Sequence, residues 1–182
     1  MTYAPLDLTL NTARLTLRQM TPDDAPEFRR MVCIPSVGRM LFVFPPDWTD
    51  EAARAWIPDW IYRGDLKLRL AIEDPSGRFI GTVGAVDMDG RVQLFYFIDP
   101  DHAGHGYVSE AARAFLTWLF AQFDMDMVHA DAFIDNPASA RVLEKLGFEY
   151  MGQGMGSSAA RLEDCAISLY RLTRNRFEST LS

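Results

Sequence analysis

FIDPDHAGHGYVSEAARAFLTWLF, residues 97–120, decides the fold, because an apolar run meets a helical pattern there across two glycines, Gly104 and Gly106. Glycine permits positive φ and lets a ligand approach the backbone closely. A loop that turns from a strand into a helix also exposes the free amides of the first helical turn, which attract anions together with the helix dipole. Residues 103–109 are therefore predicted to form a phosphate-binding loop built from backbone, with an ordinary tight turn as the alternative.

Three apolar segments precede this loop and alternate as strands do. In LKLRLAI (66–72), every second residue is leucine or isoleucine, which is the period of a half-buried strand. RFIGTVGAV (78–86) and RVQLFYFI (91–98) follow after the short turns DPSG and DMDG. Three strands joined by short turns predict an antiparallel meander.

The N-terminal part of the chain is less regular. A strand is predicted over 13–19, and a helix is predicted after Thr21, which can cap it and is followed by a proline. Residues 35–48 read as an irregular, aromatic and proline-rich segment. A further helix is predicted over 49–62, with Pro58 as the residue that kinks or ends it.

After the loop, helices and strands alternate. The patterns predict a helix from about residue 106, a strand over 127–134, a helix over 136–147 and a strand over 163–172. Strand, helix, strand implies a crossover on a partly parallel sheet. The chain is therefore predicted to be one α+β domain, residues 1–182, built on a mixed sheet.

Composition and charge restrict the partners. The chain has 182 residues and a formal net charge of −7, which argues against nucleic acid and is compatible with a cationic substrate such as an amine. Its two cysteines belong to no spaced motif, and its first residues lack the pattern of a signal peptide. No apolar run approaches the length of about 20 residues that a membrane span needs. We expect a cytoplasmic protein that does not bind membranes.

Three kinds of phosphate ligand compete for the loop. A dinucleotide fold needs G-x-G-x-x-G in an early strand–helix unit, whereas here the third position is Ser109 and a meander comes first. A Walker loop needs a lysine after its last glycine, but Tyr107 follows Gly106. The pyrophosphate of coenzyme A is the third ligand.

Two motifs, GHGYVSEA (104–111) and NPASARVLEKLGF (136–148), follow one another in the second half of the chain. Together they resemble the acyl-coenzyme A binding core of the GNAT N-acyltransferase superfamily. TARLTLRQMTPDDA (12–25) and the strand pair ending QLFYFIDP (93–100) also fit. The set is most similar to the branch that contains ribosomal-protein and other N-terminal acetyltransferases. The resemblance covers nearly the whole chain and is weakest over 35–62.

The resemblance implies a mostly antiparallel sheet that splays between strands 91–98 and 127–134 and has helices on both faces. The pantetheine arm of acetyl-CoA would lie in that gap, bonded to the backbone near Ile98, with Asn136 as a further contact or as a helix cap alone. The pyrophosphate would rest on the loop, whose cofactor-binding residues would be Ala103, Gly104, His105, Gly106, Tyr107 and Val108.

The loop departs from many relatives, which carry arginine or glutamine where this chain has Asp101, His102 and Ala103. His102 and His105 are therefore alternative phosphate ligands. Their spacing would also suit a metal, but no third ligand is evident and no metal site is predicted. His129, in a following strand, is expected to be structural.

The implied reaction is direct attack of a neutral amine on the acetyl thioester. Ser139 occupies the serine of N-x-x-S, whose hydroxyl can donate to the leaving thiolate; an ordinary helix serine is the alternative. Gln93 stands where relatives often carry a carboxylate, and an amide is no useful base at neutral pH. Asp87 is therefore predicted as the base, with Glu163 next, although each also reads as a solvated turn residue. Tyr96 lines either the acetyl site or the core.

The acceptor is the least determined part of the prediction. Neutralising a lysine-type amine of pKa ~10.4 at pH 7 costs about 4.6 kcal/mol, whereas an α-amine of pKa ~8 costs about 1.4 kcal/mol. A weak base therefore favours an α-amine on a peptide or amino-acid-like molecule. The acceptor pocket is expected from 35–62 and 148–165, with GQGMGSSA (152–159) as a mobile flap. A small-molecule amine and a non-catalytic acyl-CoA-binding module are the alternatives, in a monomer or homodimer.

Overall fold

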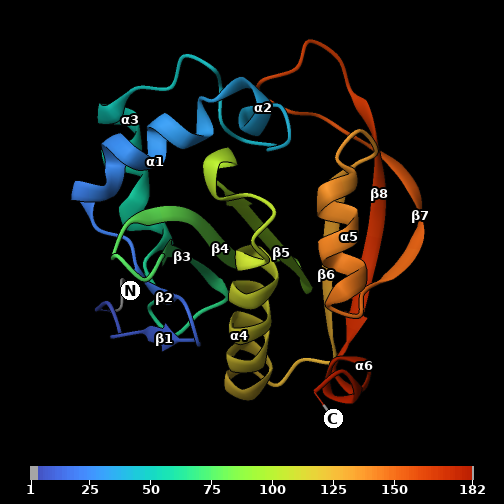
Figure 1. Ribbon diagram of the computed structural model, residues 1–182. Coiled ribbons are helices and arrows are strands. Elements are labelled where there is room, and N and C mark those ends of the chain that lie inside the picture. Colours follow the sequence, from blue (N-terminus) through green and yellow to red (C-terminus); the bar gives the residue numbers. More distant parts are fainter. Residues whose placement is uncertain (1–3, 182) are drawn as a thin grey trace.

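The computed structural model describes residues 4–181 (Figure 1). Eight strands form one sheet in the order β1-β2-β3-β4-β5-β6-β8-β7. The strands are β1 (Thr9–Asn11), β2 (Thr16–Gln19), β3 (Lys67–Glu73), β4 (Phe79–Met88), β5 (Arg91–Ile98), β6 (Met127–Phe133), β7 (Glu149–Gly156) and β8 (Cys165–Thr173). The α-helices are α1 (Ala25–Val32), α2 (Pro35–Gly38), α3 (Asp50–Trp56), α4 (Tyr107–Gln122), α5 (Pro137–Lys145) and α6 (Arg174–Ser179), and the 3-10 turns are η1 (Pro22–Asp24), η2 (Ile57–Trp60) and η3 (Pro100–His102).

The predicted meander is confirmed. Strands β3, β4 and β5 pair antiparallel in sequence order, and β6, β8 and β7 form a second antiparallel group. The two groups meet where β5 and β6 run parallel, paired at Gln93 and His129. Helix α4 makes the connection between these parallel strands. The mixed, mostly antiparallel sheet expected from the sequence is therefore present.

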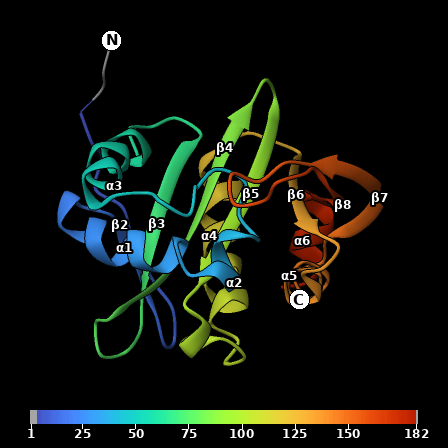
Figure 2. The ribbon, with the colours of Figure 1, turned by 90° about the horizontal axis from the view of Figure 1, so that it is seen from above.

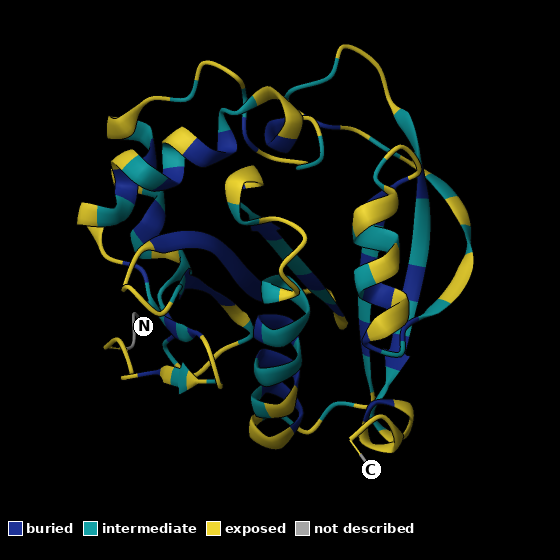
Figure 3. Ribbon diagram, in the orientation of Figure 1, coloured by how far each residue is buried: buried dark blue, intermediate teal, exposed yellow. Residues whose placement is uncertain are grey.

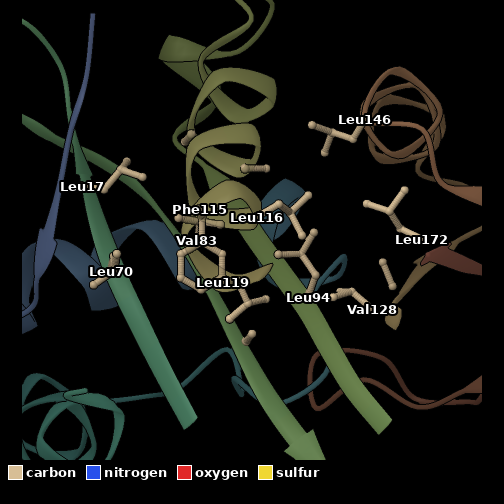
Figure 4. Packing of buried hydrophobic residues seen from close by; sticks show 14 of the residues in the cluster. Leu17, Leu70, Val83, Leu94, Phe115, Leu116, Leu119, Val128, Leu146 and Leu172 are labelled. Atoms are coloured by element: carbon tan, nitrogen blue, oxygen red, sulfur yellow. The ribbon is translucent and has the colours of Figure 1, made fainter. Parts of the chain in front are cut away.

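Helices cover both faces of the sheet. On one face, Phe115, Leu116 and Leu119 of α4 pack in the same buried cluster as Val83 and Leu94 of the central strands (Figure 4). Helices α5 and α6 complete this face over β6 and β8, through Leu143, Leu146 and Phe177. On the other face, α1, α2 and α3 enclose a second cluster (Figure 2). Phe28 of α1 and Phe97 of β5, whose ring centroids lie 5.7 Å apart, belong to this second cluster. Residues of alternating parity on β5 thus serve two separate cores.

Helix boundaries follow the capping signals of the sequence. The side chain of Asn136 accepts a hydrogen bond from the amide of Ser139 at 3.2 Å, which fixes the start of α5. Thr49 caps α3 in the same way, and α3 ends at Trp56 because Pro58, which has no amide proton, lies in the 3-10 turn that follows.

The prediction of a mobile flap over 152–159 is wrong for most of its length. Residues 149–156 form β7, an edge strand paired with β8 through a regular ladder that shifts once near Gly152. The glycines of this segment have no side chains to alternate, so the strand period is hidden in the sequence. The loop that remains is tied down, since the amide of Ala159 donates to the carbonyl of Phe42 at 3.0 Å.

Three further helices and strands were not predicted. Strand β1 is short, α2 is a four-residue helix inside the segment expected to be irregular, and α6 follows the last predicted strand. The N-terminal strand is also shorter than predicted, over 16–19. Within residues 4–181, no helix combines the length and the apolar character that a membrane crossing requires.

Candidate active site

The loop between β5 and α4 has the conformation that its glycines allow. Gly104 has φ +80° and Gly106 has φ +78°, both in the left-handed region. The ladder of α4 opens with the amide of Glu110, which donates to the carbonyl of Gly106 at 3.0 Å. The amides of Tyr107 and Val108 therefore lie ahead of the ladder. Residues 103–106 are exposed (Figure 3), so this helix start is open to an anion.

A pair of charged side chains supports the loop from behind. Arg14, in the β1–β2 turn, donates from Nε to Oε2 of Glu110 at 2.7 Å and from Nη1 to the carbonyl of His105 at 3.1 Å. Thr12 donates to the other oxygen of Glu110 at 2.6 Å. Burial raises the pKa of Glu110, but the hydrogen bonds from Thr12 and Arg14 outweigh it and hold that pKa below its usual value. This contact explains why the TARL and GHGY-x-x-EA motifs occur together, and it brings a guanidinium to a loop that lacks one.

The two histidines near the loop have other neighbours. His102 lies in η3, with Nε2 3.8 Å from the carboxylate of Asp74 in the β3–β4 turn. His105 is exposed and stacks on Tyr107, with ring centroids 5.6 Å apart. Of the two, only His105 lies within residues 103–106, where the loop is exposed.

The sheet opens between β5 and β6. In the described chain these strands share one bridging pair, Gln93 with His129, and the edge of β5 from Leu94 to Ile98 has no ladder partner on the β6 side. Ile98 is paired on its other side with Gly81 of β4. An extended ligand can therefore take up the free backbone groups of this edge, as an added strand would.

Two hydroxyl groups meet across this opening. The Oη atom of Tyr96, on β5, lies 2.9 Å from Oγ of Ser139, in the first turn of α5. Burial raises the pKa of Tyr96, although the contact with Ser139 opposes the shift. The phenol therefore stays protonated at neutral pH, and the pair can supply a proton to a group placed in the opening.

A second polar group lies on the opposite face of the same strands. Asp131 of β6 accepts a hydrogen bond from Arg91 at 3.1 Å and another from the Gln93 side chain, and its side chain is 19% exposed. Burial raises the pKa of Asp131, while Arg91, His129 and Gln93 lower it in part. The net shift leaves a carboxylate that takes up a proton more readily than an ordinary aspartate does.

Asp131 was not among the site residues predicted from the sequence, although a signal was present. In MVHADAF, polar and apolar residues alternate, so His129 and Asp131 share a face while Val128, Ala130 and Ala132 face the core under α4 and α5. Acidic residues are rarely buried, so an aspartate in a central strand indicates either a charged partner or a function.

Of the two predicted base candidates, Asp87 lies near the β4–β5 turn and Glu163 lies in the loop that borders a cavity. Asp87 pairs directly with Val92, so it faces the α4 side of the sheet, whereas Gln93 faces the other side. Asp87 is exposed, and its carboxylate accepts the amide of Gly90 at 2.7 Å in the β4–β5 turn. Glu163 is exposed in the loop before β8.

A cavity of about 610 Å³ opens between α1, α2 and the β7–β8 loop. Val32, Ile34, Pro35 and Leu162 give it apolar walls, and both cysteines of the chain line it. Its charged lining residues are Arg39, Arg161 and Glu163.

The wall of this cavity reaches the sheet through Arg161. The guanidinium of Arg161 lies 4.2 Å over the ring of Phe133, two residues beyond Asp131 on β6. The lining residues of the cavity fall within 32–46 and 160–165, so they overlap the two segments, 35–62 and 148–165, from which an acceptor pocket was predicted, and they also include the end of α1.

Comparison with known proteins decides the family. The family profile described as "Acetyltransferase (GNAT) domain" matches residues 14–149, about three quarters of the chain. The chain belongs to the GNAT acetyltransferase family. It is 29% identical over 151 residues to "Uncharacterized N-acetyltransferase p20" of Bacillus licheniformis, a match that covers 79% of this chain and 84% of that protein.

Two solved GNAT structures share the fold at low identity. A spermidine N-acetyltransferase from Vibrio cholerae, solved with CoA and spermine, superposes with a TM-score of 0.78 at 17% identity, covering 92% of this chain and 99% of that one. A ribosomal-protein-S5-alanine acetyltransferase from Vibrio fischeri superposes with a TM-score of 0.73 at 17% identity, covering 94% and 99%. Their acceptors differ in kind, so fold alone does not select one.

This GNAT protein is an acyl-CoA-dependent N-acetyltransferase that uses acetyl-CoA. Its residues fit that ligand in two places. The left-handed loop at Gly104 and Gly106 leaves helix amides open to a pyrophosphate, and the free edge of β5 suits the extended pantetheine arm. When bound, acetyl-CoA supplies the activated acetyl group.

Proposed function

We propose that the acceptor is the α-amine of a peptide or of an amino-acid-like molecule, bound in the 610 Å³ cavity. The charge of that cavity carries this proposal. Arg39 and Arg161 each lie 2.8 Å from the single carboxylate of Asp135, and Glu163 is the one carboxylate among the described lining residues. A polyamine has several ammonium groups and would meet two guanidiniums here. A peptide presents one amine and several carbonyl oxygens, which arginine can bind.

The size of the cavity supports the same acceptor. Small-molecule sites commonly measure about 300–1,000 Å³, and this volume holds more than one amino-acid residue. Its apolar walls at Val32, Ile34 and Leu162 suit side chains of the same character. A small aromatic or aliphatic amine is the second candidate, because the same walls would hold its apolar body.

The chain's own residues divide the work. We assign Ala103, Gly104, His105, Gly106, Tyr107 and Val108 to the pyrophosphate through their backbone, and Ile98 to the pantetheine arm. Asn136 holds the start of α5, so that the hydroxyl of Ser139 faces the opening between β5 and β6. There Ser139 serves as the proton donor to the departing sulfur. Tyr96 orients the Ser139 hydroxyl through their 2.9 Å contact.

The acceptor proposal is tested by comparing amines. At pH 7, a peptide with a free α-amine should be acetylated at least about tenfold faster than a matched peptide whose only amine is a lysine side chain, because the α-amine is far cheaper to neutralise. Initial rates of free-thiol release at equal acetyl-CoA measure this. A peptide blocked at both amines serves as the blank. Faster acetylation of the lysine peptide, or of a polyamine, would refute the proposal.

The role of Ser139 has its own test. Ser139→Ala should lower kcat by about 10- to 100-fold, which is at or below the lower end of the range for general acid catalysis, while the Kd for acetyl-CoA changes little. Tyr96→Phe, which keeps the ring and removes the hydroxyl, should cause a smaller loss. An unchanged kcat in Ser139→Ala would leave Ser139 as a helix residue only.

A further inference from the structure

Asp131 lies at the point where β5 and β6 separate. In parallel pairing, Gln93 is level with His129, so Asp131 is level with Phe95 and stands just beyond the last bridged pair. It faces the same side of the sheet as Gln93, whose side chain donates to it. This is the side on which Phe133 meets Arg161 of the cavity wall.

Asp131 and Ser139 flank the opening from opposite sides. Tyr96 follows Phe95 on β5 and points the other way, toward Ser139 of α5. The level of Asp131 along the strands is therefore only about 3.3 Å, one residue step, from that of Tyr96. A thioester carbon in the opening would have a carboxylate on the cavity side and a hydroxyl pair on the α5 side.

We propose that Asp131 is the catalytic base of this acetyltransferase. It would do the work of the carboxylate expected on β5, where this chain has Gln93. This rests on the proposed function, in which the acceptor amine enters from the cavity. Directly or through one water molecule, the ammonium of the acceptor gives a proton to the Asp131 carboxylate. The nitrogen lone pair then forms the C–N bond as the C–S bond breaks, and the sulfur leaves with its electron pair.

The protons balance with one released to solvent. The nitrogen loses two protons in all. The first goes to Asp131, which passes it to water, and the second goes to solvent after the C–N bond forms. The sulfur gains one proton from Ser139, which recovers it from solvent. Asp131 thus turns over without net change.

The charged groups around Asp131 set its working range. Arg91 on β5 and His129 on β6 act on it directly, and Arg171 of β8, which pairs with His129, faces the same side. Burial raises the pKa of Asp131 and Arg91 lowers it. The pKa of His129 is held below its usual value by burial and by the positive charges of Arg91 and Arg171, although the negative charge of Asp131 opposes this shift. His129 is therefore neutral at pH 7.

The decisive variant is Asp131→Asn, which keeps the shape and removes the base. At pH 7 it should lower kcat about 100-fold for a lysine amine, which is the lower end of the range for general base catalysis, and about tenfold for an α-amine, which is cheaper to neutralise. The loss should shrink above the pKa of the amine, where the acceptor is neutral without help. Asp124→Asn, an exposed aspartate just past α4, is the matched control.

A second variant distinguishes a base from a structural partner of Arg91. Arg91→Gln leaves the Asp131 carboxylate in place and removes the cation that lowers its pKa. The acid limb of the kcat profile should therefore move to higher pH, with His129→Asn measured alongside to identify any limb from the histidine. If the Arg91–Asp131 ion pair were only structural, Asp131→Asn and Arg91→Gln would lose equal activity and the acid limb of the kcat profile would not move. That result would overturn the assignment.

Failure of the base and failure of the acceptor proposal give different results. The variants are compared on whichever amine the wild-type enzyme acetylates fastest. If that amine is a polyamine but Asp131→Asn still loses activity, the acceptor proposal falls and the base stands. If Asp131→Asn retains full activity while Asp87→Asn does not, the base assignment falls.

Discussion

Gly106→Val is expected to weaken acetyl-CoA binding by more than about 100-fold. Gly106 has φ +78° and caps α4, and a residue with a Cβ pays roughly 1–2 kcal/mol in that conformation, more if it is branched. The methyl groups would also enter the space in front of the amides of Tyr107 and Val108. Within residues 4–181, and leaving aside the chain neighbours, Nη2 of Arg14, at 3.6 Å, is the only atom within 4 Å of a Cβ at this position, so the fold itself has room for the side chain. Binding should therefore suffer more than folding.

Calorimetric titration with acetyl-CoA measures this effect. Gly106→Ala should fall between wild type and Gly106→Val, since it carries the strain without the branched methyls. His105→Ala removes an exposed ring from the same loop. This variant should bind acetyl-CoA nearly as well as wild type if the phosphate site is formed by backbone amides. Equal affinity in Gly106→Val and wild type would remove the loop from the phosphate site.

The conformation of the loop between β5 and α4 could be predicted from the sequence because it is determined locally. A tight turn into a helix often requires positive φ, which glycine adopts without strain, and Gly104 and Gly106 are both left-handed in the structure. The caps at Thr49 and Asn136 are local in the same sense. Each of these features depends on residues within four positions of one another.

The proposed base, Asp131, could not be predicted because its position depends on the register between distant strands. Asp131 reaches the opening only through the parallel pairing of Gln93 with His129, which are 36 positions apart in the chain. Asp87 looked nearer to Gln93 in sequence, but strand alternation turns it to the opposite face. The ion pair between Arg14 and Glu110 was not predicted for the same reason, because it joins two motifs that are far apart in the sequence.

Gly84→Val is expected to destabilise the protein by more than about 4 kcal/mol, which for many domains abolishes folding. Gly84 is buried in the central strand β4, and a Cβ there would lie 2.4 Å from the carbonyl oxygen of Leu68 and 2.4 Å from the ring of Phe95. The first contact is with backbone, so relief would require β3 and β4 to separate. Glycine is required at this position because the ring of Phe95 occupies the space beside it. The centroid of that ring lies 4.2 Å from Cζ of Arg69.

Arg69 makes the same substitution costly in a second way. Arg69 is only 5% exposed, and it donates a hydrogen bond to the hydroxyl of Thr82 at 2.7 Å. Its charge is further stabilised by the faces of the surrounding rings, of which Phe95 is the nearest. Burial lowers the pKa of Arg69 to about 9, which reflects how little water reaches it. Moving Phe95 aside would leave this cation without its closest ring.

Gly154→Ala on β7 is the matched control, since its Cβ would meet only side chains at 3.5 Å or more. Urea unfolding should show a near-normal midpoint for Gly154→Ala and no folded baseline for Gly84→Val; a wild-type midpoint for Gly84→Val would mean that β3, β4 and Phe95 are not packed as closely as these distances require.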